Sequence, residues 1–171
     1  MAKETVGHGK WAQPGVPHRG WRCVDYYDTF ERLGEGQYET CEMCETVTIR
    51  FIHVMEHDEY SDRLECGCVC AEHMEQDKTA PQRREKTMRG RASRRAKFAD
   101  RKGWKTSARG NPYIKVDGYH IVIAKKFAGY KIGITPPFSE DARWGSRQYA
   151  TVEAAKLGAF TALEYMKEQT P

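Results

Sequence analysis

The chain has 171 residues, of which 39% are hydrophobic and 30% charged, and its mean hydropathy is −0.79. No run approaches the roughly 18 apolar residues of a membrane span, and residues 1–20 lack the apolar stretch of a secretory signal, so we expect a cytoplasmic protein. Its length suits one ordinary domain or two small modules, of which we expect two, and six cysteines in a reducing compartment favour a metal site over disulfides.

The net charge of +4 is unevenly distributed along the chain. Residues 1–82 carry 8 basic and 16 acidic side chains, residues 83–105 carry 11 and 2, and residues 106–171 carry 9 and 6. A basic block of this kind is typical of a surface that binds a polyanion. The alternative is that the basic block pairs with the acidic residues that precede it.

The first half of the chain is predicted to form one module after a flexible arm. Residues 1–20 show no hydrophobic period and are assigned to the arm. The aromatic run WRCVDYY predicts a short strand, and a polar loop then leads to the pair CEMC at 41–44. The run TVTIRFIHVM predicts a strand, LECGCV a short returning strand, and CAEHMEQD the start of a helix. These elements assign residues 21–80 to one module.

Residues 81–106 are predicted to be a basic helical segment. Pro81 suits a first helical position, and we expect the helix to run to about Lys102. Its apolar stripe is sparse, and Gly90 weakens its middle by about 1 kcal/mol relative to alanine. A helix this polar needs a partner.

Residues 107–171 are predicted to form the second module. NPYIKV and YHIVIAKK flank Asp117-Gly118, a strong hairpin signal, and YKIGI adds a third antiparallel strand. Thr151 suits the N-cap of a helix through about Lys167, whose apolar residues recur at helical spacing. The predicted fold class is therefore α+β, with a three-stranded antiparallel sheet and one packed helix in this module.

The spacing of the cysteines predicts a structural zinc site. A CxxC knuckle supplies two thiolates from a tight turn, and the end of the following hairpin supplies a second pair. The predicted Zn²⁺ ligands are Cys41, Cys44, Cys68 and Cys70. Cys66 is an alternative because it would share a strand face with Cys68, and His73 is another because it follows Cys70 by one helical turn.

The knuckle, hairpin and helix resemble a treble-clef zinc finger. The strings CEMC, RFIHVMEH and CGCVCAEHM are similar to small uncharacterised zinc-finger proteins of bacteria and their phages. The resemblance covers about residues 21–80. It implies a fold and a structural zinc ion, and it carries no activity.

A nuclease is one alternative that the treble-clef resemblance brings with it. HNH-type nucleases also build on this fold, with a catalytic histidine near the end of the corresponding strand and a divalent metal. His53 or His57 would take that role here. The Asp-His pair and the loop asparagine of that family have no match in the sequence, so we favour packing and turn roles for both histidines.

Basic residues supply the candidate contacts to a nucleic acid. Each phosphate that they neutralise releases counterions, which makes the affinity strongly salt-dependent. The candidates from the basic segment are Arg83, Arg84, Arg89, Arg91, Arg94, Arg95, Lys97, Arg101, Lys102 and Lys105. Those from the predicted sheet are Lys115, Lys125 and Lys126, with His120 and Lys131 beside them.

The strand, strand, strand, helix order of residues 107–169, with RQYATVEAAKLGAFTAL entering the helix, is similar to the N-terminal DNA-binding domains of tyrosine integrases. That resemblance implies that the sheet enters the major groove. A fainter resemblance to double-stranded RNA-binding domains lacks the lysine-rich entry to the last helix.

Taken together, these patterns predict a non-catalytic, zinc-containing nucleic-acid-binding protein, with DNA favoured over RNA. A metal-dependent nuclease is one alternative. The other is a protein-binding adaptor or inhibitor that meets a host protein through the acidic first module.

Overall fold

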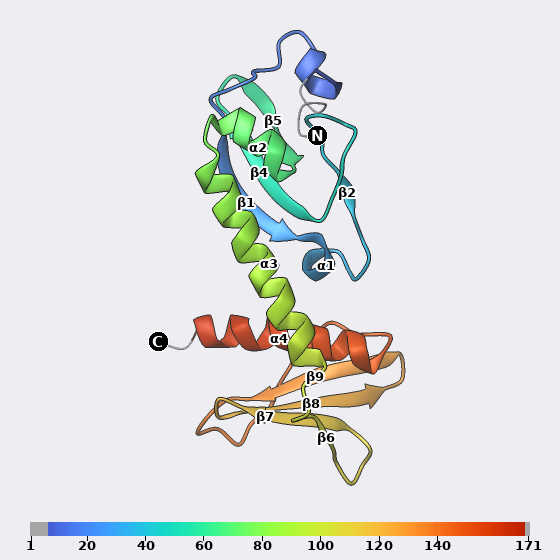
Figure 1. Cartoon of the computed structure of the whole chain (residues 1–171). Helices are drawn as coiled ribbons and strands as arrows, with labels where there is room; N and C mark the ends of the chain where they lie inside the picture. The colour runs from blue at the N-terminus through green and yellow to red at the C-terminus, as the bar shows by residue number, and fades with distance from the viewer. Residues whose placement is uncertain (1–6, 170–171) are drawn as a thin grey trace. The chain divides into compact units, whose positions relative to one another are not determined.

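The computed structural model describes residues 7–169 (Figure 1). The chain divides into two compact units, Met1–Ala92 (unit 1) and Ser93–Pro171 (unit 2). Each unit combines strands with helices, which confirms the predicted α+β class. Unit 1 has a net charge of −4 and unit 2 a net charge of +8. Within residues 7–169, no helix is both long and apolar enough to cross a membrane.

Unit 1 is built around a three-stranded antiparallel sheet with the order β1-β4-β5. Its strands are β1 (Arg22–Asp28), β4 (Phe51–His57) and β5 (Tyr60–Cys66), and a two-stranded ribbon is formed by β2 (Glu39–Thr40) and β3 (Thr48–Ile49). The helices are α1 (Thr29–Arg32), α2 (Cys68–Glu75) and the first part of α3 (Thr79–Ala99). β4 is the central strand, and its first five residues are all buried. Burial on both faces explains why its sequence, apart from His53, is apolar without alternating.

The predicted flexible arm is ordered over its described part, residues 7–20. Gly9–Ala12 form a short 3₁₀ helix, η1, and the Lys10 amide donates to the Met43 carbonyl at 2.8 Å. Trp11 is only 4% exposed and belongs to the core of unit 1. A single tryptophan has no hydrophobic period, so the sequence pattern carried no signal of this burial.

α3 begins in unit 1 and ends in unit 2, so the predicted basic segment 81–106 is divided between the two units. The helix starts at Thr79, two residues before Pro81, and ends at Ala99 rather than near Lys102. Two of its sparse apolar residues are buried, and one of them, Phe98, belongs to the core of unit 2. Met88 is 5% exposed in unit 1, and Phe98 is 7% exposed in unit 2.

Unit 2 contains a five-stranded antiparallel sheet with the order β10-β9-β8-β7-β6. The strands are β6 (Lys105–Thr106), β7 (Pro112–Val116), β8 (Tyr119–Lys126), β9 (Gly129–Thr135) and β10 (Arg143–Trp144). The three longer strands are those predicted. The two edge strands were not predicted, because two residues are too few to show an alternating pattern.

α4 (Val152–Glu168) packs on one face of this sheet, against β8 and β9 (Figure 1). Its N-cap is Thr151, whose hydroxyl oxygen accepts a hydrogen bond from the Ala154 amide at 3.1 Å, as the sequence predicted. Ile121, Ile123 and Phe160 are among the residues of the shared core. The helix α4 therefore leaves the opposite face of the sheet uncovered.

Two turns in the sheet require residues with positive φ. Asp117 and Gly118, with φ of 51° and 81°, join β7 to β8, and Gly129, with φ of 133°, begins β9. A Cβ atom on Gly129 would collide with the carbonyl oxygen of Tyr149. Gly129 therefore combines a backbone conformation that favours glycine with a contact that admits no side chain.

The substitution Gly129→Ala should lower the stability of unit 2 by about 3 kcal/mol or more, because it adds a steric clash to backbone strain. Gly110→Ala is the matched control, since Gly110 has a φ of 78° and no atom within 4 Å of the added Cβ. We expect the control to cost only about 1 kcal/mol. Urea unfolding followed on the methyl NMR signals of Ile121 and Ile134 measures both, and equal costs would contradict the role assigned to the Tyr149 contact.

Candidate metal centre and nucleic-acid interface

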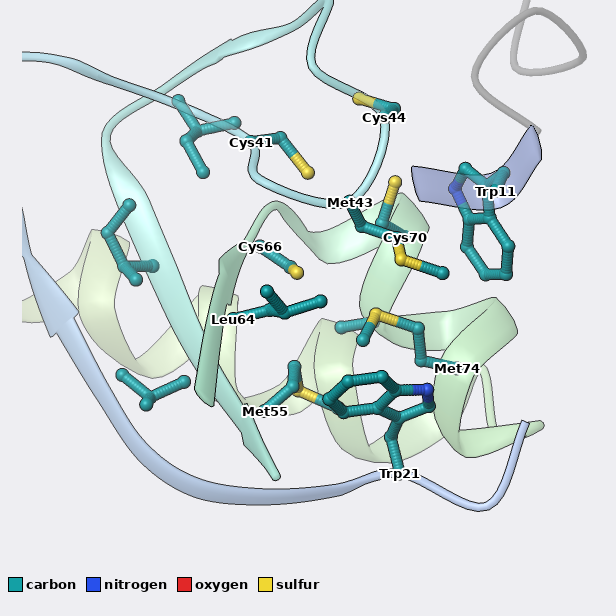
Figure 2. Close-up of a cluster of buried hydrophobic side chains, with 14 of the residues drawn as sticks. Trp11, Trp21, Cys41, Met43, Cys44, Met55, Leu64, Cys66, Cys70 and Met74 are labelled. Carbon is teal, nitrogen blue, oxygen red and sulfur yellow. The ribbon is translucent and has the colours of Figure 1, made fainter. Parts of the chain in front are cut away.

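Cys41, Cys44 and Cys70 lie close enough together to hold a metal ion. Their sulfur atoms all lie within 4.8 Å of one another, each residue is buried, and none forms a disulfide. Figure 2 shows the three sulfurs pointing toward one another, with Cys41 and Cys44 coming from the loop after β2 and Cys70 from α2. We call these three residues the cysteine cluster.

Backbone hydrogen bonds shape the turn that presents Cys41 and Cys44. The Cys41 amide donates to the Val47 carbonyl, and the Glu45 amide donates to the Cys41 carbonyl, each at 2.8 Å. Glu45 has a φ of 56°, which closes the turn tightly. The Gly67 amide lies 3.5 Å from the Cys41 sulfur, so the start of α2 also points a donor at the cluster.

The thiols polarise one another strongly. Hydrogen bonds from the Cys66 and Cys70 thiols hold the pKa of Cys41 far below its usual range, against the effect of burial. The pKa of Cys70 is raised by its hydrogen bond to Cys41, by burial and by the Cys41 charge. Thiolates are the ligands that zinc and other soft or borderline metals prefer, so the donor set fits such an ion.

The position of Trp11 also indicates that the cysteine cluster can hold negative charge on Cys70. Its Nε1 atom is buried and, within the described residues, makes no hydrogen bond. The indole acts on Cys70 by lowering its pKa, and Figure 2 shows the ring nitrogen on the side of Cys70. A metal-bound thiolate at Cys70 would be a stronger acceptor for this donor.

The remaining predicted ligands do not lie in the cysteine cluster. Cys66, at the end of β5, contacts Cys41 through its thiol. Cys68 lies beside His53 and Glu85 instead. His73 packs edge-on to Trp11, with ring centroids 6.3 Å apart. Cys68 and Cys70 are both in α2, where two residues correspond to a rotation of about 200°, so their thiols point to opposite sides of the helix.

A second group combines His53, Cys68 and Glu85, whose ligand atoms also lie within 4.8 Å of one another. His53 is fully buried, and burial together with the charge of Arg84 lowers its pKa to about 4. Burial and the nearby carboxylates of Glu85 and Glu72 raise the pKa of Cys68 to about 12. The sequence carried no signal for this group, because its members come from three separate elements.

His57 has the turn role that we favoured from the sequence. Its Nδ1 accepts a hydrogen bond from the Glu59 amide at 3.0 Å, and its Nε2 lies 3.1 Å from the Arg19 carbonyl oxygen. Because a carbonyl can only accept, Nε2 carries the proton and neither nitrogen has a free lone pair. This geometry gives no support to His57 as a general base.

Several of the candidate arginines form ion pairs within unit 1. Arg84 binds both carboxylate oxygens of Glu75 at 2.8 Å, and Arg91 binds Glu31 at 2.7 Å. Arg89 binds Glu85, one turn earlier in α3. These contacts agree with the alternative of intramolecular pairing for this part of the basic block.

Arg95 is buried, with an exposed fraction of 7%, and so it is also not displayed at the surface. The other candidates from the basic segment are exposed. They are Arg83, Arg94, Lys97, Arg101, Lys102 and Lys105.

The face of the unit 2 sheet opposite α4 is basic and aromatic. Ile121 and Ile123 point toward the helix, so the alternate residues of β8 point away from it. Cross-strand pairing then assigns the neighbours of these residues to the same face. We call this face the open face, and its side chains are Lys105, Tyr113, Lys115, His120, Val122, Ala124, Lys126, Lys131, Thr135 and Trp144.

No aspartate or glutamate occurs in β6 to β10, so the basic side chains of the open face have no acidic neighbour within the sheet. The Trp144 ring lies over Gly133, where an added Cβ would come within 3.0 Å of it, and Lys126 lies 5.3 Å from the ring centre. Tyr113 and His120 form a second aromatic pair, with ring centroids 5.5 Å apart. Lys125 alternates to the other face, although it was predicted together with Lys126.

Comparison of the chain with protein-family models, curated proteins and solved structures finds no match.

Replacing Cys70 with serine should remove bound metal from the cysteine cluster and unfold unit 1, because its core closes around these sulfurs. Unit 2 should stay folded, since its core residues contain no cysteine. Elemental analysis measures the metal, and two-dimensional NMR separates the signals of the two units. Cys23→Ser is the control, because the Cys23 thiol donates to the Asp25 carbonyl and lies outside both groups. Unchanged metal content in Cys70→Ser would exclude the cysteine cluster as a metal centre.

Proposed function

We propose that this chain is a zinc-containing nucleic-acid-binding protein, in which unit 2 binds duplex DNA and unit 1 is a treble-clef zinc module. The observation that carries the proposal is the open face of the unit 2 sheet. It displays Lys105, Lys115, Lys126 and Lys131, together with His120 and two aromatic rings, and its strands contain no acidic residue.

The charge of the open face supports a polyanion as its ligand. Lysines on a face without acidic partners gain little from the protein itself, whereas each phosphate contact releases condensed counterions. Trp144 and Tyr113 add flat apolar surface of the kind that contacts bases or thymine methyl groups. The basic surface of unit 2, with its net charge of +8, is consistent with this ligand.

The dimensions of the sheet favour the major groove of DNA. The three longer strands β7 to β9 span roughly 10 Å at the usual strand spacing of about 4.8 Å, which is comparable with a groove about 12 Å wide. In this mode, Lys105 and Trp144 on the edge strands β6 and β10 would lie at the rims of the groove. The major groove of RNA is too narrow to be read in this way. The resemblance of residues 107–169 to integrase N-terminal domains agrees with this mode of binding, in which the sheet enters the groove and the helix remains outside.

The order of elements in unit 1 supports the treble-clef assignment. A CxxC knuckle leads through β3 to the hairpin β4–β5, and Cys70 lies in the first turn of the helix that follows. We assign Zn²⁺ as the ion, because buried cysteine thiolates are typical ligands of structural zinc. Cys66 is the fourth ligand in this proposal, since its thiol already contacts Cys41.

A binding role fits the histidines better than a nuclease role. His57 has both nitrogens engaged, and His53 is fully buried, so neither presents a base to a phosphodiester at the surface.

Replacing Lys126 with glutamine should weaken binding to a duplex DNA and reduce the salt dependence of log K by about 0.9, the value for one lost phosphate contact. Lys125→Gln is a matched control, because it makes the same charge change at the next residue but on the α4 side of the sheet. Fluorescence anisotropy of a labelled duplex across a salt series measures both slopes. Equal effects of the two substitutions, or a slope near zero for the unaltered protein, would argue against the open face.

Replacing Arg91 with glutamine separates the paired arginines from the open face. The change breaks the ion pair with Glu31, so we expect unit 1 to lose about 1 kcal/mol of stability. The salt dependence of DNA binding should stay the same, because Arg91 is already neutralised within the protein. A reduced slope would show instead that Arg91 leaves Glu31 to contact phosphate.

A further inference from the structure

His53 has a buried nitrogen whose hydrogen-bonding capacity is not used. The residue is fully buried in β4, and its Nε2 has no hydrogen-bond partner among residues 7–169. Its Nδ1 lies 3.2 Å from the Nε of Arg84, which can only donate. Because Arg84 donates to Nδ1, Nε2 carries the ring proton in this tautomer and is a buried donor without an acceptor, which is costly. Moving that proton to Nδ1 frees the Nε2 lone pair for a ligand that the protein itself does not supply.

The same imidazole lies in the group with Cys68 and Glu85 described above. These residues come from three elements: His53 from β4, Cys68 from the first position of α2, and Glu85 from α3. Each offers one ligand atom, and the three atoms lie within 4.8 Å of one another. A common metal ion can therefore reach all three.

Charged neighbours give the group an excess of negative charge. Glu72 lies beside Cys68, with 3.6 Å between the sulfur and Oε1, and is held by Gln82 at 3.0 Å. Arg84 is balanced by Glu75, and Arg89 holds Oε1 of Glu85 at 2.9 Å. With Cys68 ionised, these groups carry a net charge of about −2, which matches a divalent cation.

We propose that His53, Cys68 and Glu85 form a second metal site, separate from the cysteine cluster, which binds Zn²⁺ or a similar borderline divalent ion. One nitrogen, one sulfur and one oxygen ligand suit such an ion, whereas Mg²⁺ and Ca²⁺ prefer oxygen ligands alone. Three protein ligands leave a fourth position for water. The site is independent of nucleic-acid binding.

Metal binding at this site removes the proton of Cys68 and breaks the contact between Arg84 and His53. The Cys68 thiol loses its proton to solvent and coordinates as thiolate. Arg84 Nε must give up its contact with His53, because coordination either takes Nδ1 directly or takes Nε2 and moves the ring proton to Nδ1. Arg84 keeps both carboxylate oxygens of Glu75 through its terminal nitrogen. The bound ion would join β4, α2 and α3 within unit 1.

The test is the number of zinc equivalents that the full chain retains after dialysis, measured by elemental analysis. We expect two equivalents for the unaltered protein. Cys68→Ser and Glu85→Gln should each lower the number to one, with at least about a tenfold loss in affinity for the second equivalent. Cys23→Ser is the matched control, since Cys23 and Cys68 are both half-buried, and it should retain two.

Cobalt substitution identifies which equivalent is lost. In Cys68→Ser and Glu85→Gln, the strong sulfur-to-cobalt absorption of the cysteine cluster should remain, which also shows that unit 1 is still folded. A single equivalent in the unaltered protein would overturn the proposal. Retention of two equivalents by Glu85→Gln would also overturn it, as would loss of the cluster's absorption in Cys68→Ser, because Cys68 would then belong to the first site.

Discussion

The meeting of sulfurs from two distant segments determines the structure of unit 1. Cys41 and Cys44 come from a loop that has few apolar residues of its own, and Cys70 comes from a helix of eight residues. Neither piece would be stable alone, because short helices and isolated turns are marginal in water. Met43 and Trp11 then pack around the sulfurs, so the cysteine cluster joins the N-terminal residues, the knuckle and α2 into one core (Figure 2).

The basic residues of the chain include arginines that pair with carboxylates and lysines that have no acidic neighbour in their strands. Arg84 and Arg91 have planar guanidinium groups held by carboxylates, and these contacts stabilise the packing of α3 on unit 1. The lysines of the open face are exposed or half-buried and have no acidic neighbours in their strands. Arginines of the basic run are therefore partly neutralised within the protein, whereas the open face is formed mainly by lysines that follow this run in the sequence.

The sequence predicted the parts of the fold that depend on local rules. The Asp117-Gly118 turn, the Thr151 cap and the three longer strands of unit 2 follow from backbone conformation and alternation, and all are present. The contact of the Trp11 segment with Met43, through the Lys10 amide, and the pairing of Arg91 with Glu31 join residues 33 and 60 positions apart, which no local pattern reports. The group of His53, Cys68 and Glu85 could not be predicted for the same reason, because the topology of β4, α2 and α3 brings its members together.

The segment CGCVC shows how little sequence is needed to direct thiols to different places. Cys66 ends a strand, Cys68 begins a helix, and Cys70 lies about 200° further around that helix. The spacing of the cysteines, rather than their number, therefore determines where each thiol lies. Inserting or deleting one residue would leave the composition almost unchanged, yet it would rotate a sulfur to the wrong side of the helix and exchange the partners of the two groups.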